Sequence, residues 1–328
     1  DVYKRQTFSF GPLGAKGFAF LNMIQLIGWT SIMIYDAMLA LQELAPLSPM
    51  IWTIAIGALV ILWLFIGLHN TGYIQAIVSV LLLGLTLYMG VHMISQWPSD
   101  SSFMTNGNMS FIAALELSIA MPLSWLPLIS DYTRESKSPF SASLTSATIY
   151  TVTSVAMYTL GLSAAIFGGG DSIITIMMNA GLGLAGLLVI IFSTVTTTFM
   201  DAYSAGVSST TIYNGASSKG VAVIVTIVGA IAAILYPMDD ITEFLYLIGS
   251  VFAPMIAILL ADYFVNRQQV QTLSAYLVRG LIWAIAVGLY HYMLHSESSI
   301  GATLPAFTIA FIVTSIVGFI SKTANTLL

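Results

Sequence analysis

A stripe of hydroxyl groups with one carboxylic acid runs through an otherwise apolar stretch, residues 191–209. On a helix its members recur every three or four residues and therefore share one face. They are Thr194, Thr197, Asp201, Ser204 and Ser208. A carboxylate at membrane depth is costly, and it usually faces a cavity or a partner. The stripe therefore indicates a polar binding site among apolar helices, with Asp201 as its candidate acid.

A second group of hydroxyls, Ser193, Thr196 and Thr197, lies on a neighbouring face of the same expected helix. Hydroxyl oxygens three or four residues apart face one side of one turn, and together they can hold a small hard cation. The alternative is that each hydroxyl bonds back to its own helix or joins it to a neighbour. Isolated contacts of that kind need no acid nearby, so Asp201 favours a binding site for the stripe as a whole.

Polar groups also line one face of a helix expected near the N-terminus. Asn22, Gln25, Trp29 and Asp36 follow one another at spacings of three, four and seven residues, which places them on one side of that helix. Trp29 is either part of the packed core or an aromatic platform for a flat ligand. This face is the second candidate surface for a binding site.

Residues 110–130 form an apolar stretch that contains Pro122 and Pro127, with Glu116 before them. Proline removes a backbone donor and frees carbonyl groups upstream. Broken backbone at membrane depth survives only against protein or a water-filled cavity, and broken helices build the midplane sites of transporters. A simple proline kink is the alternative. Together the three surfaces indicate a solute transporter with a hydroxyl-lined cation site and a carboxylate nearby.

The composition places these stretches in a membrane. Apolar residues make up 58% of the chain and charged residues 7%, whereas a soluble domain carries about 25% charged residues. Cysteine is absent, which excludes disulfides and thiolate chemistry. The formal net charge of −5 provides no basic surface for nucleic acid. The sequence therefore predicts an all-α, polytopic membrane protein with the lipid bilayer as a partner.

Ten apolar stretches are long enough to span a bilayer at about 20 residues each. They cover residues 16–44, 50–68, 72–96, 110–130, 140–167, 182–211, 220–236, 241–265, 275–294 and 304–320. Their connections are short, so residues 16–328 are expected to form one transmembrane domain. Residues 1–15, which open with DVYKRQT, have no apolar core. We expect this segment to be non-helical and to mark a fragment or a cloning scar.

Charge predicts the orientation of these spans. The basic residues outside or near the ends of the spans are Lys4, Arg5, Lys16, Arg134, Lys137, Lys219, Arg267, Arg279 and Lys322. With ten spans they all fall on one side, and the loops of the other side carry only acids. Basic residues mark the cytoplasmic side of a membrane. We therefore expect both termini in the cytoplasm and the protein in the cell membrane.

Three segments carry a resemblance to a known family. PLSWLPLISDYTR (122–134), STVTTTFMDAYSAG (193–206) and NMIQLIGWTSIMI (22–34) resemble the nucleobase:cation symporter-1 family, and most of all its hydroxymethylpyrimidine and cytosine permease branch. The resemblance covers essentially the whole chain after about residue 7. It implies a twelve-helix fold with two inverted five-helix repeats, of which this chain lacks the first two helices. Residues 16–96 would then be a remnant of the first repeat, 110–265 the second repeat and 275–320 two accessory helices.

The resemblance also implies roles for individual residues. Thr196 and Thr197 match the hydroxyl ligands of the family's sodium site, and Ser193 supplies a carbonyl one turn earlier. Asp201 falls beside a substrate-contacting position, and Trp29 and Trp125 are candidates to stack a flat ring. The candidate substrate-binding residues are Asp201, Trp29, Gln25, Glu116, Trp125 and Pro122.

The implied function is that of a secondary active symporter and not of an enzyme. It would import hydroxymethylpyrimidine, a thiamine precursor, or cytosine by alternating access, with sodium or a proton as the coupling ion and no other cofactor. A carboxylate such as Asp201 or Glu116 can accept a hydrogen bond from the exocyclic amine of such a ring. The exact substrate, the coupling ion and the oligomeric state are left open.

An intramembrane aspartyl protease is the rival from another class. Tyr35-Asp36 and the GxGD sequence that ends at Asp171 resemble the two short motifs of such enzymes, which need two facing carboxylates to activate water. The expected topology places Asp171 in an external loop, and the chain lacks the Pro-Ala-Leu tripeptide of that family. A transporter of another small solute on the same fold is the closer alternative.

Overall fold

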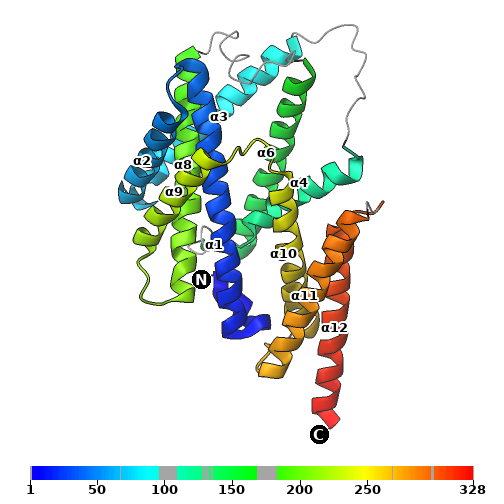
Figure 1. Cartoon of the computed structure of the whole chain (residues 1–328). Coiled ribbons are helices and arrows are strands. Elements are labelled where there is room, and N and C mark those ends of the chain that lie inside the picture. The colour runs from blue at the N-terminus through cyan, green and yellow to red at the C-terminus, as the bar shows by residue number, and fades with distance from the viewer. Residues whose placement is uncertain are drawn as a thin grey trace.

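The computed structural model describes residues 2–66, 68–95, 109–127, 129, 133, 136–167, 183–267, 269–296 and 299–327. Within these ranges the chain forms ten α-helices and one π-helix, η1 (Figure 1). They are α1 (Val2–Leu44), α2 (Pro49–Ile66), α3 (Leu68–Ser95), α4 (Phe111–Trp125), α6 (Pro139–Phe167), α8 (Gly183–Ile212), α9 (Ser218–Leu235), α10 (Thr242–Leu260), η1 (Ala261–Asn266), α11 (Leu273–His295) and α12 (Thr303–Leu327).

Each of the ten predicted spans overlaps one of these α-helices, and the described residues include no strand. Among the described residues, seven helices are long and apolar enough to cross a membrane, and two shorter apolar stretches lie in α3 and α4. The predicted all-α class is therefore confirmed. The division of the chain into a partial repeat, a full repeat and two accessory helices stays a prediction.

The prediction that residues 1–15 are non-helical is wrong, because α1 begins at Val2. The helix bends at Gly11, whose φ of 67° and ψ of −177° suit a residue without a side chain. The segment before the bend is anchored by tertiary contacts: Val270 N donates to the carbonyl of Phe8 at 3.0 Å, and the ring of Phe10 packs edge-on against that of Phe18. Such packing stabilises a short helix that its own sequence does not.

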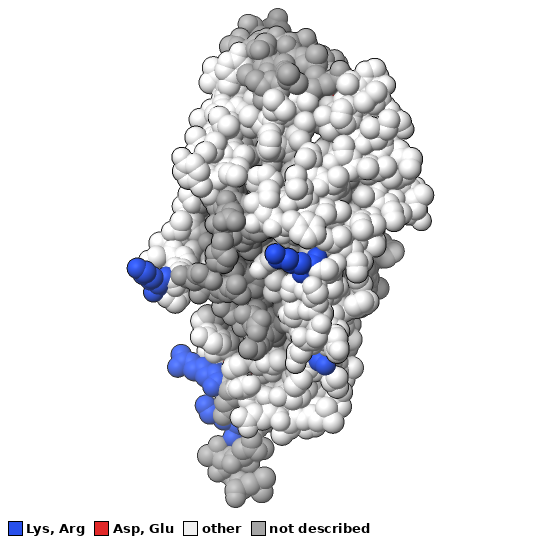
Figure 2. Space-filling view, turned by 90° about the vertical axis from the view of Figure 1, so that its left-hand side faces the viewer, with Lys and Arg blue, Asp and Glu red and all other residues white. Residues whose placement is uncertain are grey.

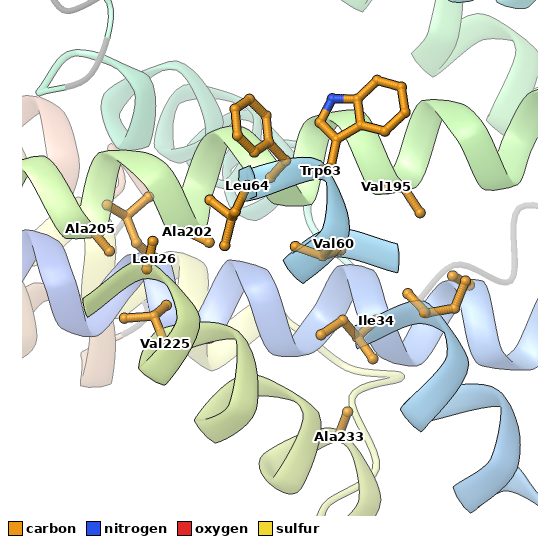
Figure 3. Close-up of a cluster of buried hydrophobic side chains, with 14 of the residues drawn as sticks. Leu26, Ile34, Val60, Trp63, Leu64, Val195, Ala202, Ala205, Val225 and Ala233 are labelled. Atoms are coloured by element: carbon orange, nitrogen blue, oxygen red, sulfur yellow. The ribbon is translucent and has the colours of Figure 1, made fainter. Parts of the chain in front are cut away.

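Helix α8 lies in contact with α1, α2, α3 and α9. Figure 3 shows the apolar cluster between four of these helices. It contains Leu26 and Ile34 of α1, Val60, Trp63 and Leu64 of α2, Val195, Ala202 and Ala205 of α8, and Val225 and Ala233 of α9. Small side chains such as those of Ala202 and Ala205 allow helix backbones to approach closely inside a membrane. One side of α8 is therefore held firmly, which fixes the direction of its polar stripe.

Helix α6 is packed very differently. It contacts α3, and none of its described side chains at 139–163 is buried. An apolar helix with such exposure must be covered by lipid or by further helices.

The basic residues gather at one end of the molecule. Lys16 lies near the start of α1, Lys219 near the start of α9, and Lys322 near the end of α12. The bend of α1, the start of α9 and the end of α12 are the lower ends of these helices in Figure 1. On the face in Figure 2, Lys and Arg side chains occupy the middle and lower parts, and none of the described residues at its upper end is basic. This arrangement agrees with the segregation of charge that the sequence predicts.

One basic residue at this end is buried. The side chains of Arg279 on α11 and Asp262 on η1 form an ion pair with Nη2 and Oδ1 3.0 Å apart. Asn266 Nδ2 donates both to Asp262 Oδ1 at 2.8 Å and to the carbonyl of Thr314 on α12 at 3.1 Å. The cluster therefore joins α10 and η1 to α11 and α12. A π-helical turn directs Asp262 and Asn266 into it, and such turns often mark functional positions.

Arg279→Ala should destabilise the protein by about 3–5 kcal/mol, because it leaves the carboxylate of Asp262 buried without its partner. The exposed Arg267 provides the matched control, and Arg267→Ala should change stability by less than about 1 kcal/mol. Unfolding in detergent, followed by circular dichroism, measures both. Equal stability of the two variants would show that the ion pair contributes nothing to the fold.

Candidate substrate and cation site

A buried chain of hydrogen bonds connects α8, α1 and the end of α4. Asn22 Nδ2 donates to Ser208 Oγ at 3.1 Å, and Gln25 Nε2 donates to Asn22 Oδ1 at 2.7 Å. Gln25 Nε2 also donates to the carbonyl of Ser124 at 3.0 Å. All four residues are buried. The three surfaces that the sequence marked as polar or broken are thus joined by direct contacts.

Helix α4 ends where this network reaches it. The helix runs to Trp125 and is followed by a turn at Leu126 and Pro127. Leu126 N still donates to the carbonyl of Pro122, at 3.2 Å, whereas Pro127 has no backbone N–H to continue the ladder. The predicted interruption of this span therefore occurs at Pro127, while Pro122 stays inside the helix. The carbonyl of Ser124, near the interruption, is available to the amide of Gln25.

Two polar atoms of α1 point to a ligand at this place. The Oε1 atom of Gln25 and the Nε1 atom of Trp29 are buried, and neither has a hydrogen-bond partner within the described part of the chain. They lie one helical turn apart, and one is an acceptor and the other a donor. Buried polar groups without partners are uncommon in native proteins. A ligand that presents one N–H and one acceptor would satisfy both.

The indole of Trp29 is held by a neighbouring aromatic ring. Its ring packs edge-on against Phe244 of α10, with centroids 5.3 Å apart. The structure therefore uses Trp29 for packing, which was one of the two alternatives, and also leaves its N–H without a partner. Phe244 was missed by sequence reasoning, because an aromatic residue in an apolar helix carries no local signal of such a role.

Asp201 is buried in α8, with 6% of its surface exposed. Arg279, the buried basic residue described above, is bound to Asp262 at the basic end of the molecule. None of the hydrogen bonds and ion pairs found between described residues involves Asp201. Its stripe continues to Ser204 and to Ser208, which meets Asn22 of α1. The stripe thus lies on the side of α8 that faces the network.

The three expected cation ligands converge on a single turn of α8. Thr196 Oγ1 and Thr197 Oγ1 both donate to the carbonyl of Ser193, at 2.9 and 2.8 Å. These bonds are the back-bonding that the sequence offered as the alternative reading. A hydroxyl that donates keeps its lone pairs, so the turn still presents two hydroxyl oxygens, whereas the Ser193 carbonyl already accepts from both hydroxyls. A small hard cation needs more oxygen ligands than these, and a second element would have to supply them.

No group of three or more His, Asp and Glu among the described residues is placed to hold a metal ion. The turn at Ser193, Thr196 and Thr197 offers neutral oxygen atoms, which suit sodium rather than a transition metal.

Glu116 has another partner. Its Oε1 accepts from the backbone N–H groups of Ala302 and Thr303 at 3.0 and 2.8 Å, and its Oε2 accepts from the Thr303 hydroxyl at 3.0 Å. It therefore caps the first turn of α12, where a negative charge is favourable. Gly301, with a φ of 76°, lies against this carboxylate. These contacts do not support a substrate role for Glu116, which stays a prediction.

A cavity of about 560 Å³ adjoins the capped turn. Glu116 lines it together with Tyr246 of α10 and Met293 of α11. Sequence reasoning missed this arrangement, because Glu116 and Thr303 are 187 residues apart and no spacing rule connects them.

Trp125 and Pro122, the remaining substrate candidates, are half-buried on α4 beside Ser124.

Asp36 of the protease alternative is exposed on α1. Its neighbour Tyr35 donates a hydrogen bond to Asp239 Oδ2 at 3.1 Å. Asp171 lies outside the described residues, so the structure gives no distance between the two acids of that alternative.

Comparison with known proteins identifies a solved structure with a similar fold. No protein-family model matches the sequence, and no curated protein sequence matches it. Among solved structures the chain is similar to that of Mhp1, a nucleobase-cation-symport-1 family transporter, in a closed conformation with bromovinylhydantoin bound. The match has a TM-score of 0.72 and 17% sequence identity, and it covers 98% of this chain and 79% of that one. The chain therefore has the fold of this transporter, in agreement with the resemblance found in the sequence.

Proposed function

We propose that the protein is a secondary active symporter that moves a flat pyrimidine-type solute together with a cation. One observation carries the proposal: the buried network from Ser208 through Asn22 and Gln25 to Ser124 ends beside an unpartnered acceptor and an unpartnered donor. The Mhp1 structure, which has the same fold, contains bromovinylhydantoin. A solute bound beside the interruption of α4 would contact several helices at once, as alternating access requires.

The chemistry of the site favours an aminopyrimidine. Gln25 Oε1 can accept from a ring or amine N–H, and Trp29 Nε1 can donate to a ring nitrogen or a carbonyl. The carboxylate of Asp201, which has no basic partner among the described residues, can accept from an exocyclic amine. The acceptor oxygens of uracil would instead face this carboxylate. We therefore propose cytosine or hydroxymethylpyrimidine as the substrate, with uracil disfavoured.

Sodium is the proposed coupling ion. The support is the convergence of Thr196 Oγ1, Thr197 Oγ1 and the Ser193 carbonyl on one turn of α8. A cation there would complete its shell with oxygen atoms from another element, and movement of that element would couple the ion to the transport cycle. Protonation of Asp201 is the alternative source of coupling.

The proposed orientation follows from charge. The basic end of the molecule would face the cytoplasm of a cell membrane, with both termini on that side. The cavity beside Glu116 would then lie toward the exterior.

Asp201→Asn should weaken binding of cytosine by about 1–3 kcal/mol, because the amide keeps the size of the side chain and loses the charged acceptor. The half-saturation concentration for uptake of labelled cytosine by the full-length protein measures this. Glu43→Gln, at an exposed position near the end of α1, is the control and should leave it unchanged. An unaltered half-saturation concentration in Asp201→Asn would reassign Asp201 to a structural role.

Thr197→Ala should raise the sodium concentration needed for half-maximal uptake, because it removes one of the three converging oxygens. Thr198→Ala removes the neighbouring hydroxyl, which bonds to the carbonyl of Thr194 instead, and it should leave the sodium dependence unchanged. Uptake is measured as a function of sodium at fixed membrane potential. The assignment of a sodium site to this turn fails if uptake is independent of sodium and is driven by a proton gradient.

A further inference from the structure

A groove of about 910 Å³ opens where α1 bends at Gly11 and Pro12. The bend turns the first segment of α1 onto the loop before α11, where Val270 N donates to the carbonyl of Phe8. The rest of α1 and the first turns of α11 form the two walls, at the lower end of both helices in Figure 1. The groove is separate from the network around Gln25.

The walls of the groove are apolar. Leu13, Phe18 and Leu21 of α1 face Leu277, Leu281 and Trp283 of α11. The polar atoms of its aromatic residues are already used, because Tyr276 Oη donates to the carbonyl of Val270 at 2.7 Å and Trp283 Nε1 donates to the carbonyl of Val251 at 2.9 Å. A molecule bound in the groove would therefore contact mainly hydrocarbon side chains.

Glycines keep the groove open. Gly17 on α1 and Gly280 on α11 both line it, and a side chain built on either would meet no atom within 4 Å. The space is thus a channel along two backbones that neighbouring side chains do not fill. An extended, flexible hydrocarbon chain fits such a space better than a compact apolar side chain would.

The charge around the groove has one sign. The two segments that form it, residues 2–21 and 267–284, contain five basic residues and no acidic one: Lys4, Arg5, Lys16, Arg267 and Arg279. Arg279 is paired with Asp262, whereas Lys16 is exposed and lies between two glycines, Gly14 and Gly17, that line the groove. Basic residues beside a groove at the end of membrane helices attract anionic lipid headgroups.

We propose that this groove binds an acyl chain of an anionic phospholipid whose headgroup meets Lys16. The convex apolar faces of the other helices contact bulk lipid without preference, but this concave site combines an open hydrocarbon channel with a basic rim. The occupied site would tie the bend of α1 to α11. The proposal does not depend on which solute the protein transports.

Native mass spectrometry of the full-length protein tests this, with palmitoyl-oleoyl phosphatidylglycerol as the probe and the phosphatidylcholine of the same chains as the reference. Phosphatidylglycerol should bind about fivefold more tightly, the effect of one basic residue at an anionic surface. Gly280→Leu fills the groove and should abolish this binding. Gly288→Leu lies on the same helix, outside the groove, with the same open space around it, and should retain it.

Lys16→Gln should keep both lipids bound and remove the preference between them. Gly17→Leu fills the groove from the α1 side and replaces Gly280→Leu if that variant does not fold. The proposal is overturned if the wild type binds the two lipids equally, or if the groove-filling variant binds phosphatidylglycerol as well as Gly288→Leu does.

Discussion

The amide of Gln25 is the point on which the proposed site depends. In a membrane a buried polar group cannot hydrogen-bond to water, so its hydrogen-bond partner must come from the protein or from a ligand. The side-chain N–H groups of Gln25 donate to Asn22 on the same helix and to the Ser124 carbonyl at the end of α4. The side-chain carbonyl of Gln25 has no hydrogen-bond partner within the described residues. One side chain thus connects the packed helices to the interrupted one and still has an acceptor to offer.

The packing of α8 makes this arrangement possible. Ala202 and Ala205 hold one side of the helix in the apolar cluster with α1, α2 and α9, so the adjoining polar stripe cannot rotate away from the network. The bonds of Thr196 and Thr197 to the Ser193 carbonyl fix both hydroxyls in one orientation. Such preorganisation lowers the entropy that a cation must overcome on binding. The rigid side of α8 therefore determines the geometry of the polar side.

Local patterns in the sequence predicted much of this structure. The length and hydropathy of the apolar stretches located the ten α-helices that the structure describes, and periodicity placed Asn22, Gln25 and Ser208 on polar faces that do meet. Pro127 correctly indicated the interruption of its span. These features depend on residues close together in the chain, so a single sequence reveals them.

Contacts between distant segments were not predictable in the same way. The helix at residues 2–10 exists because Phe8 and Phe10 pack on distant partners. Glu116 was predicted to contact substrate, and nothing in its sequence indicated that it caps α12. Arg279 was predicted to lie near the end of its span, and nothing there indicated its buried pairing with Asp262. A charged residue in an apolar helix signals that a partner exists. It does not identify the partner, because that depends on the packing of whole helices.

Binding of labelled cytosine to purified full-length protein, with Gln25 and Trp29 altered one at a time, tests the central claim most directly. Gln25→Leu removes the unpartnered acceptor and the link to α4, and Trp29→Phe keeps an aromatic ring but removes the unpartnered N–H. If the two groups bind one ring, each change should weaken binding by about 1–3 kcal/mol, while Trp52→Phe should not, because the N–H of Trp52 already donates to the carbonyl of Ala45. Unchanged affinity in both variants would contradict the account and place the solute elsewhere.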